Sequence, residues 1–349
     1  MAITRDLDRS ITARVGCWWT ILRIALEERL VYRGDFALGT LMRFLPIITQ
    51  IFLWWAIFDA VGTLRGADRR IVGYTFPNMV AYYLLSMVSR AFSSMPGLAS
   101  GIALQIRNGE IKKYLIQPVD FLGFLLLTRT AHKLAYYSVA IVPFAFFFFL
   151  CRGYFVDGWP PAATISGYVA ALIMAFVLGF FLEASIGLFG FWFLEVSSLL
   201  FLYMLLNFFL SGHMFPLDML PEPWRFLVNL LPLKYLAYFP AAVFLGKVSP
   251  AEMVRGLWIE GAWIVFFIGL SRFMFQRGVR RYWFWRLACR DGASRLFRGL
   301  VDIRAQQPGA RYHVPRELHR AVRFIGFVDR DERWILSDHL SSRAIHWRL

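Results

Sequence analysis

The chain has 349 residues, of which 58% are hydrophobic and 17% charged, and its mean hydropathy is +0.52. A soluble protein of this length could not bury so much apolar surface, so the composition indicates an integral membrane protein. The formal net charge of +15 comes mostly from residues 277–349, which hold 16 Lys and Arg but only 7 Asp and Glu. No nucleic-acid-binding motif accompanies this charge, and attraction to anionic lipid headgroups explains it more simply.

Six apolar runs are long enough to cross a hydrocarbon layer about 30 Å thick at about 1.5 Å per residue. We therefore predict six transmembrane helices, at residues 38–61, 77–95, 135–151, 164–190, 196–212 and 257–275. Only residues 191–195 separate the fourth run from the fifth, and a tight turn is predicted there. The predicted fold is an all-α integral membrane protein whose transmembrane domain spans residues 38–276.

The distribution of Lys and Arg predicts the orientation in the membrane. With an inner N-terminus, 17 basic residues lie in or beside the cytoplasmic segments and 8 lie in the outer loops. Basic loops are retained in the cytoplasm, so both termini are predicted to be cytoplasmic.

Two flanking segments complete the predicted organisation. In residues 1–37, apolar side chains including Ile11, Val15, Trp18 and Leu22 recur at a helical period, which predicts an amphipathic helix along the inner membrane surface. A packing helix of a cytoplasmic domain is the alternative, but little cytoplasmic sequence exists to cover it. Residues 277–349 form a basic cytoplasmic tail whose fold the sequence leaves open.

The cytoplasmic loop after the second span mixes charged and apolar residues in a way that suits docking to another protein. A glycine permits a turn, charged residues supply a polar surface, apolar residues supply anchors, and a proline stops the helix. An ordinary solvated loop helix is the alternative interpretation. The candidate residues are Arg107, Gly109, Glu110, Lys113, Tyr114, Leu115 and Pro118.

The segment after the fifth span is apolar but broken by prolines at positions 216, 221, 223, 232 and 240. Each proline removes a backbone donor, and an unsatisfied backbone group in hydrocarbon is costly. The pattern predicts short re-entrant helices in a protein-lined outer vestibule instead of another straight span.

Three ionisable residues, Arg90, Glu183 and Glu260, lie in or near the predicted spans. Such groups are expensive in a membrane and are functional candidates. Structural roles and proton coupling both remain open for them. Three distant cysteines and scattered histidines show no ligand spacing, so we predict no metal site and no disulfide.

Three segments together resemble the permease subunit of ABC transporters of the type-two export class, in particular its bacterial branch with six spans. They are Gly109-Glu-Ile-x-x-Tyr-Leu-Ile-x-Pro118, Leu210-Ser-Gly-x-x-Phe-Pro-Leu-x-x-Leu-Pro221 and Leu230-Leu-Pro-Leu-x-Tyr235. The resemblance covers about residues 10 to 280, and the tail that follows departs from it.

The resemblance implies a connecting helix before the first span, a coupling helix that docks on an ATP-binding subunit, and re-entrant helices after the fifth span. It also implies a pair of permeases above two ATPase subunits in the bacterial cytoplasmic membrane. Gly109, Glu110, Tyr114, Leu115 and Pro118 fall in the coupling loop by position. The residues that fall at the outer gate are Ser211, Gly212, Phe215, Pro216, Leu217 and Pro221.

No phosphate-binding loop of the form Gly-x-x-x-x-Gly-Lys-[Ser/Thr] occurs in the sequence, since Gly246-Lys247 is followed by valine. The chain is therefore predicted to be no enzyme and to bind no cofactor, with ATP and magnesium held by a partner. An intramembrane serine protease is disfavoured because Ser185 lacks the preceding glycine of a nucleophile motif. We predict the permease of an ATP-driven exporter, with an ion-coupled secondary transporter as the alternative. Membrane lipids and a second permease, but no nucleic acid, are the other predicted partners.

Overall fold

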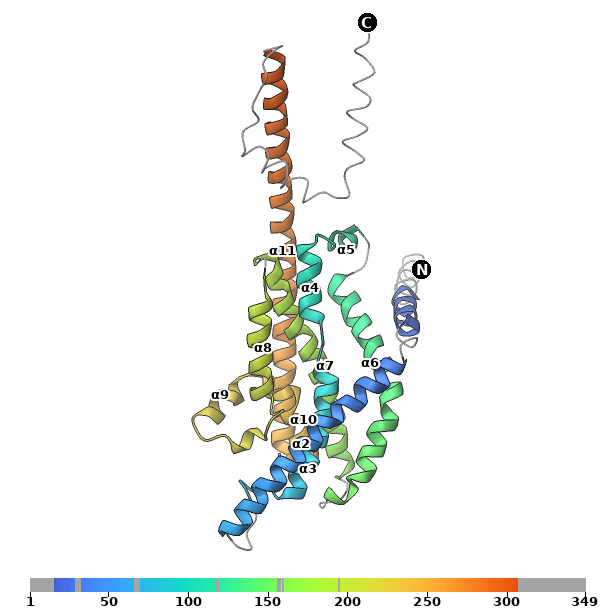
Figure 1. The fold of residues 1–349 in the computed structure, drawn as a ribbon, viewed down its shortest axis with the longest axis vertical. Coiled ribbons are helices and arrows are strands. Elements are labelled where there is room, and N and C mark those ends of the chain that lie inside the picture. The colour runs from blue at the N-terminus through green and yellow to red at the C-terminus, as the bar shows by residue number, and fades with distance from the viewer. Residues whose placement is uncertain are drawn as a thin grey trace, which may run out of the picture. The chain divides into compact units, whose positions relative to one another are not determined.

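The computed structural model describes residues 16–28, 33–65, 70–116, 120–155, 158, 160–193 and 195–306. The chain divides into two compact units, residues 1–283 and 284–349. Within the described residues the regular elements are helices, together with an isolated β-bridge between Ile71 and Tyr74 (Figure 1). The principal helices are α2 (Arg33–Arg65), α3 (Phe76–Ser93), α4 (Leu98–Arg107), α5 (Lys112–Ile116), α6 (Phe121–Leu150), α7 (Ala162–Leu188), α8 (Ser197–Leu210), α9 (Trp224–Leu230), α10 (Tyr238–Phe244) and α11 (Pro250–Gln306).

Four helices are long and apolar enough to cross a membrane, namely parts of α2, α6, α7 and α11. Large apolar side chains on these helices are exposed, for example Val142 at 71%, Trp258 at 78% and Phe52 at 65%. Water-exposed apolar surface of this extent is unusual for a soluble protein, whereas lipid tails would cover it. Of the two other predicted spans, α8 has 14 residues and α3 does not reach the same apolar character. The prediction of six spans is thus confirmed only in part.

Helix α3 is polar for a span because neighbouring helices cover it. Twelve of its 18 residues are buried, and α2, α7 and α10 pack around it. Its N-terminus is capped by Thr75, whose hydroxyl accepts a hydrogen bond from the Asn78 amide at 3.4 Å. Tyr82, Tyr83 and Ser89 are tolerated in α3 because each hydroxyl donates to a backbone carbonyl group of the protein.

Helices α3 and α4 approach α7 at two of its glycines. A Cβ atom added to Gly179 would lie 2.2 Å from the Ser93 carbonyl oxygen, and one added to Gly187 would lie 2.7 Å from the Ala99 carbonyl oxygen. Small residues allow such close approach of backbones in membrane bundles. The sequence of α7 therefore fixes its distance from the break between α3 and α4.

Helix α6 begins earlier than the sequence analysis predicted. It begins at Phe121, whereas the apolar run predicted a start at Ala135 and a loop as far as Lys133. The intervening turns contain Arg129 and Lys133, which lower the hydropathy of the run. These two side chains bond to carbonyl groups of the α3–α4 region, as described below, so the helix continues through them.

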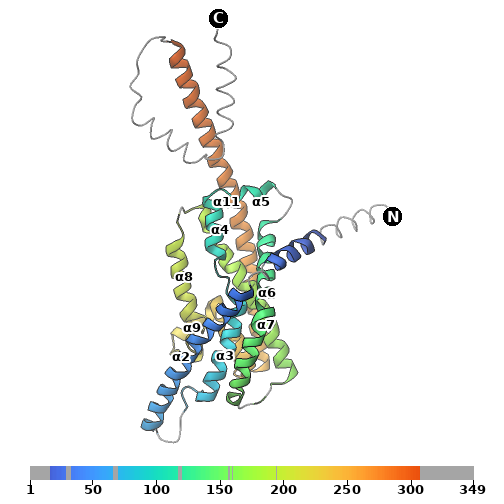
Figure 2. The same ribbon diagram turned by 45° about the vertical axis from the view of Figure 1, so that its right-hand side comes forward.

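The segment after α8 is not a straight helix, as the prolines predicted. It consists of the short helices η3 (Leu217–Met219), α9, η4 (Pro232–Leu236) and α10. Figure 2 shows α9 below α8. Whether these helices re-enter the membrane stays a prediction.

The described part of the N-terminal segment, residues 16–28, is helical. Arg23 and Glu27 form an exposed ion pair at 2.8 Å, and Trp18 lies beside Gly123 of α6. Helix α11 continues from the predicted sixth span through residue 306, and its residues 284–306 belong to the second unit.

Candidate functional site

The predicted coupling segment lies between α4 and α6 and contains α5. Gly109 has a φ of 74°, a left-handed conformation that glycine adopts without the steric cost of a Cβ atom. The side chains of Arg107, Glu110 and Lys113 are exposed, and Lys113 bonds to Glu110 at 3.2 Å. The Leu115 side chain and Pro118 lie outside the described residues. The segment presents both signs of charge on its exposed surface.

Tyr114 packs against aromatic residues of its own chain. Its half-buried ring lies 5.1 Å from the ring of Phe121 and 5.4 Å from that of Phe124, measured between centroids. The ring fixes α5 on the first turn of α6. Whether Tyr114 also serves as an anchor for a partner protein stays a prediction.

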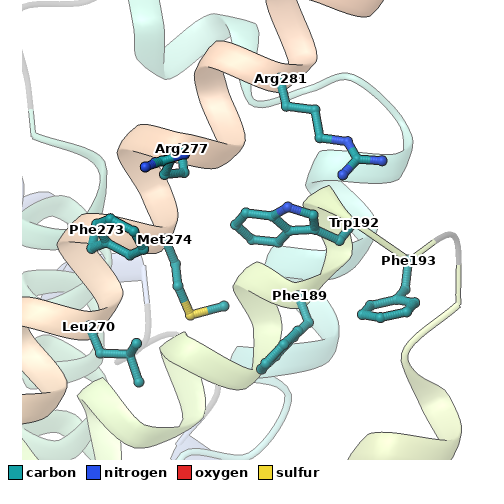
Figure 3. Close-up of a pocket in the computed structure, with 8 residues that line it drawn as sticks. All are labelled: Phe189, Trp192, Phe193, Leu270, Phe273, Met274, Arg277 and Arg281. Carbon is teal, nitrogen blue, oxygen red and sulfur yellow. The ribbon is translucent and has the colours of Figure 1, made fainter.

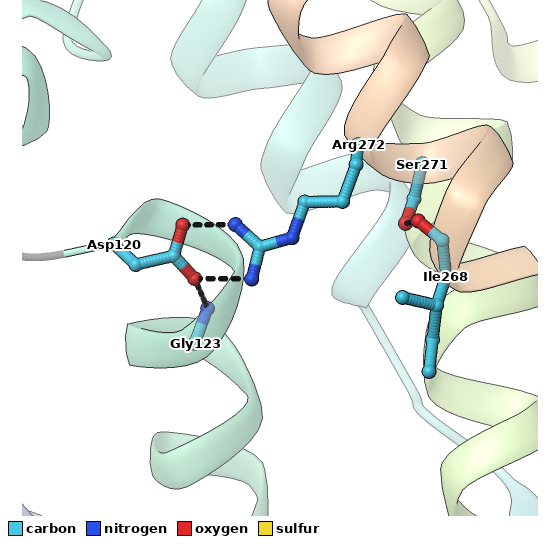
Figure 4. Close-up of polar contacts among 5 residues, drawn as sticks. All are labelled: Asp120, Gly123, Ile268, Ser271 and Arg272. Carbon is cyan, nitrogen blue, oxygen red and sulfur yellow. Dashed lines mark hydrogen bonds and ion pairs between the residues drawn. The ribbon is translucent and has the colours of Figure 1, made fainter. Parts of the chain in front are cut away.

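Asp120 joins the same region to α11 (Figure 4). Its carboxylate caps α6 by accepting a hydrogen bond from the Gly123 amide at 2.6 Å. The two guanidinium nitrogens Nη1 and Nη2 of Arg272 also bind this carboxylate, the Nη2 contact at 2.8 Å. Bidentate pairs of this kind are directional and stronger than neutral hydrogen bonds. One acidic side chain therefore holds the start of α6 against α11.

A polar cluster surrounds the break between α3 and α4. Lys133 donates to the carbonyl oxygens of Ala91 and Ser94, the latter at 2.7 Å. Arg129 donates to the Pro96 carbonyl at 2.9 Å. Gly97, with a φ of 72°, completes the break. The two cations of α6 satisfy backbone acceptors that the interrupted helix leaves without an intrahelical partner.

Glu183 of α7 lies at the same break. Its Oε1 atom accepts a long hydrogen bond from the Met95 amide at 3.4 Å, and the positive charges of Arg129, Lys133 and Arg90 act on its carboxylate. Sequence analysis singled out Arg90 and Glu183, and the structure brings them into one charged environment. Sequence analysis missed Arg129 and Lys133 because it assigned both residues to a loop. The signal available was their spacing of four residues, which places them on one face of a helix.

Glu260 of α11 is separate from that cluster. It is 0% exposed, and neither of its carboxylate oxygens has a hydrogen-bond partner among the described residues. Of the three predicted intramembrane groups, Glu260 alone lacks such a partner within this part of the chain.

No group of three or more His, Cys, Asp or Glu that could hold a metal ion occurs among the described residues.

Tyrosines at and before α3 hold the predicted outer-gate segment. Tyr82 donates to the Gly212 carbonyl and Tyr83 to the Met214 carbonyl, and Tyr74 donates to Asp218 Oδ2 at 2.9 Å. Burial first, and then the Asp218 carboxylate, raise the pKa of the Tyr74 hydroxyl well above its ordinary value, so the hydroxyl stays a donor. The segment is anchored by side chains that sequence analysis did not identify.

The predicted outer-gate residues occupy different environments. Ser211, Gly212, Pro216 and Leu217 are buried, Phe215 is half-buried and Pro221 is exposed. Gly212 has a φ of 82°, and a Cβ atom there would lie 2.6 Å from Tyr238 and 2.8 Å from the Tyr82 hydroxyl. These residues therefore form the buried start of the segment, and Pro221 lies beyond it.

Removing both hydroxyls in the Tyr82→Phe/Tyr83→Phe variant is expected to loosen this segment. Each lost bond leaves a carbonyl group without its donor, at a cost of about 1–3 kcal/mol if water cannot replace it. We expect faster hydrogen exchange over residues 212–219, measured by mass spectrometry of the purified protein. Tyr154→Phe is the control, because the Tyr154 hydroxyl makes none of these contacts. Unchanged exchange in the double variant would contradict the anchoring role.

The fold and these contacts define a multi-pass helical membrane protein with charged groups held between its helices. The sequence model of the ABC-2 family transporter proteins matches residues 44–283, so the chain belongs to this family and is an ABC-2 type permease. The match ends at the boundary of the first compact unit. No curated protein matches the chain.

Proposed function

We propose that the chain is the membrane-spanning subunit of an ATP-driven exporter. Two permeases, identical or different, would work with two ATP-binding subunits that hold ATP and magnesium. The observation that carries this proposal is the coupling segment, whose charged surface is exposed while Tyr114 and Asp120 tie it to α6 and α11. A partner that moves α5 would therefore act on two long membrane helices.

The coupling role is tested with Tyr114→Ala and Lys113→Ala. Loss of the ring removes the contacts that position α5, and it also removes the predicted anchor, which at an interface is typically worth about 2 kcal/mol or more. The exposed Glu110–Lys113 pair is worth under about 1 kcal/mol. We expect Tyr114→Ala to lose most of the copurifying ATPase, and Lys113→Ala to retain it. Equal retention by both variants, with normal membrane insertion, would contradict a docking role for α5.

An ion-coupled carrier is the second candidate, and the buried Glu260 favours it. A carrier would stop working in Glu183→Gln or Glu260→Gln and would collapse with a protonophore in ATP-replete cells. An ATP-driven exporter would instead lose transport when the ATPase is inactivated and keep it with the protonophore. Transport that survives loss of the ATPase but fails in the glutamine variants would overturn the proposed function.

Orientation is part of the proposal: both termini and α5 face the cytoplasm of a bacterium, and the segment after α8 faces outward. The test uses two single-cysteine variants, in which a cysteine replaces Glu110 or Glu222 and the three native cysteines have been removed. Both positions are exposed, whereas Asp218 is engaged by Tyr74 and is a poorer reporter. In intact cells we expect a membrane-impermeant thiol reagent to modify position 222 and not position 110. The reverse labelling pattern would invert the topology.

A further inference from the structure

A groove lies between α11 and the residues that follow α7, within the first unit (Figure 3). Its volume is about 760 Å³. Six of its lining residues are apolar or aromatic, and two are arginines at one end. The lining residues are Phe189, Trp192, Phe193, Leu270, Phe273, Met274, Arg277 and Arg281.

One wall of this groove is the turn after α7, which packs closely against α11. A Cβ atom on Gly278 would lie 2.2 Å from the ring of Phe191, so only glycine lets that ring approach α11 so closely. Phe191 also meets Phe275 edge to face, with ring centroids 6.3 Å apart. These contacts hold the turn after α7 beside α11, while Phe189, Trp192 and Phe193 line the groove.

The two arginines differ from their neighbour Arg272. Arg272 is paired with Asp120, whereas neither Arg277 nor Arg281 has a carboxylate partner among the described residues. Arg277 lies over the Phe273 ring at 5.3 Å, and Arg281 extends on the side of Trp192 in Figure 3. Within this part of the chain, their charges therefore stand uncompensated next to an apolar surface.

The groove lies at the end of the first unit where α5 is found. Ile111, next to α5, packs in one apolar cluster with Met274 of α11, and Met274 lines the groove. In the proposed orientation this end faces the cytoplasm, where the membrane surface carries anionic lipids. A bare anion would leave the apolar groove uncovered, and a neutral apolar chain would leave the arginines without a counter-ion.

We propose that this groove binds an anionic phospholipid of the cytoplasmic leaflet. The lipid phosphate lies between Arg277 and Arg281, and an acyl chain lies over Trp192, Leu270 and Phe273. Amphipathic shape and charge complementarity both select this occupant. The site requires membrane insertion with this end inward, and it does not depend on ATP-driven transport.

Native mass spectrometry of the full-length purified permease tests the site, with phosphatidylglycerol and phosphatidylcholine of equal chain length as probes. Basic residues near a membrane each contribute about fivefold to binding of anionic lipid, so Arg277→Gln/Arg281→Gln should weaken phosphatidylglycerol binding by about 30-fold. Arg280→Gln removes a charge from the same turn without lining the groove, and should change binding by less than about fivefold.

A second variant tests the apolar part of the site. Leu270→Trp fills the groove and should lower phosphatidylglycerol binding, whereas Val265→Trp, at a position that is 70% exposed on the same helix, should not. Thermal unfolding of each variant shows that the fold is intact. Equal binding of both lipids by the native chain, or equal losses in the double arginine variant and Arg280→Gln, would overturn the proposal. Equal effects of the two tryptophan variants would do the same.

Discussion

Gly179→Ala is expected to disrupt the packing of α7 against α3. The new methyl group would lie 2.2 Å from a backbone oxygen of Ser93, so a rotamer change cannot relieve the contact. Overpacking of this kind costs about 1–3 kcal/mol and sometimes more. The upper end applies here, because two helices must separate. We expect the midpoint of thermal unfolding in detergent to fall by about 5–10 °C.

Gly269→Ala is the matched control for this prediction. Gly269 lies in the α11 helix, and a Cβ atom added there would have no neighbouring protein atom within 4 Å, so the new methyl group causes no clash. The unfolding midpoint of this variant should match that of the native protein. An unchanged midpoint for Gly179→Ala would mean that α3 and α7 can separate at little cost, contrary to the packing described above.

Lys133→Met is expected to be the most damaging substitution in the polar cluster. It removes the charged donor to the carbonyls of Ala91 and Ser94, and it takes a positive charge from the surroundings of Glu183. Two acceptors without donors cost about 2–6 kcal/mol together, because each costs about 1–3 kcal/mol when buried. We expect a low yield of folded protein after size-exclusion chromatography.

Two comparisons make this result specific. Lys113→Met removes the same functional group from an exposed pair and should leave the yield unchanged. Adding Glu183→Gln to Lys133→Met should recover part of the yield, because it removes the carboxylate that lost a neighbouring cation. Strictly additive losses in the double variant would show that the two side chains do not interact.

The sequence predicted the four long apolar helices well because hydropathy reports on apolar surroundings, whether these are lipid or neighbouring helices. It failed at α6 because hydropathy treats Arg129 and Lys133 as groups that need water. In the structure they bond to backbone oxygens at the α3–α4 break, so the helix extends through them. The predicted second span likewise ends early, at Ser93, because α4 begins as a separate helix after that break.

The candidate site was predicted where the signal is local. Gly109 and Gly212 occupy left-handed positions that glycine favours, and prolines divide the chain after α8. The tyrosines that hold this segment lie 130 to 144 residues away along the chain. No local pattern pairs residues at that distance. The clue in the sequence was the pair Tyr82 and Tyr83 in a predicted span, each with a hydroxyl that must find an acceptor.

The shared carboxylate of Asp120 has a mechanical consequence. It accepts hydrogen bonds from both the Gly123 amide at the start of α6 and the Arg272 guanidinium, and the Tyr114 ring packs on the same first turn of α6. A bidentate pair tolerates little rotation before one of its two bonds breaks. Tilting the first turn of α6 would therefore load the Asp120–Arg272 pair directly, and through it the contact with α11.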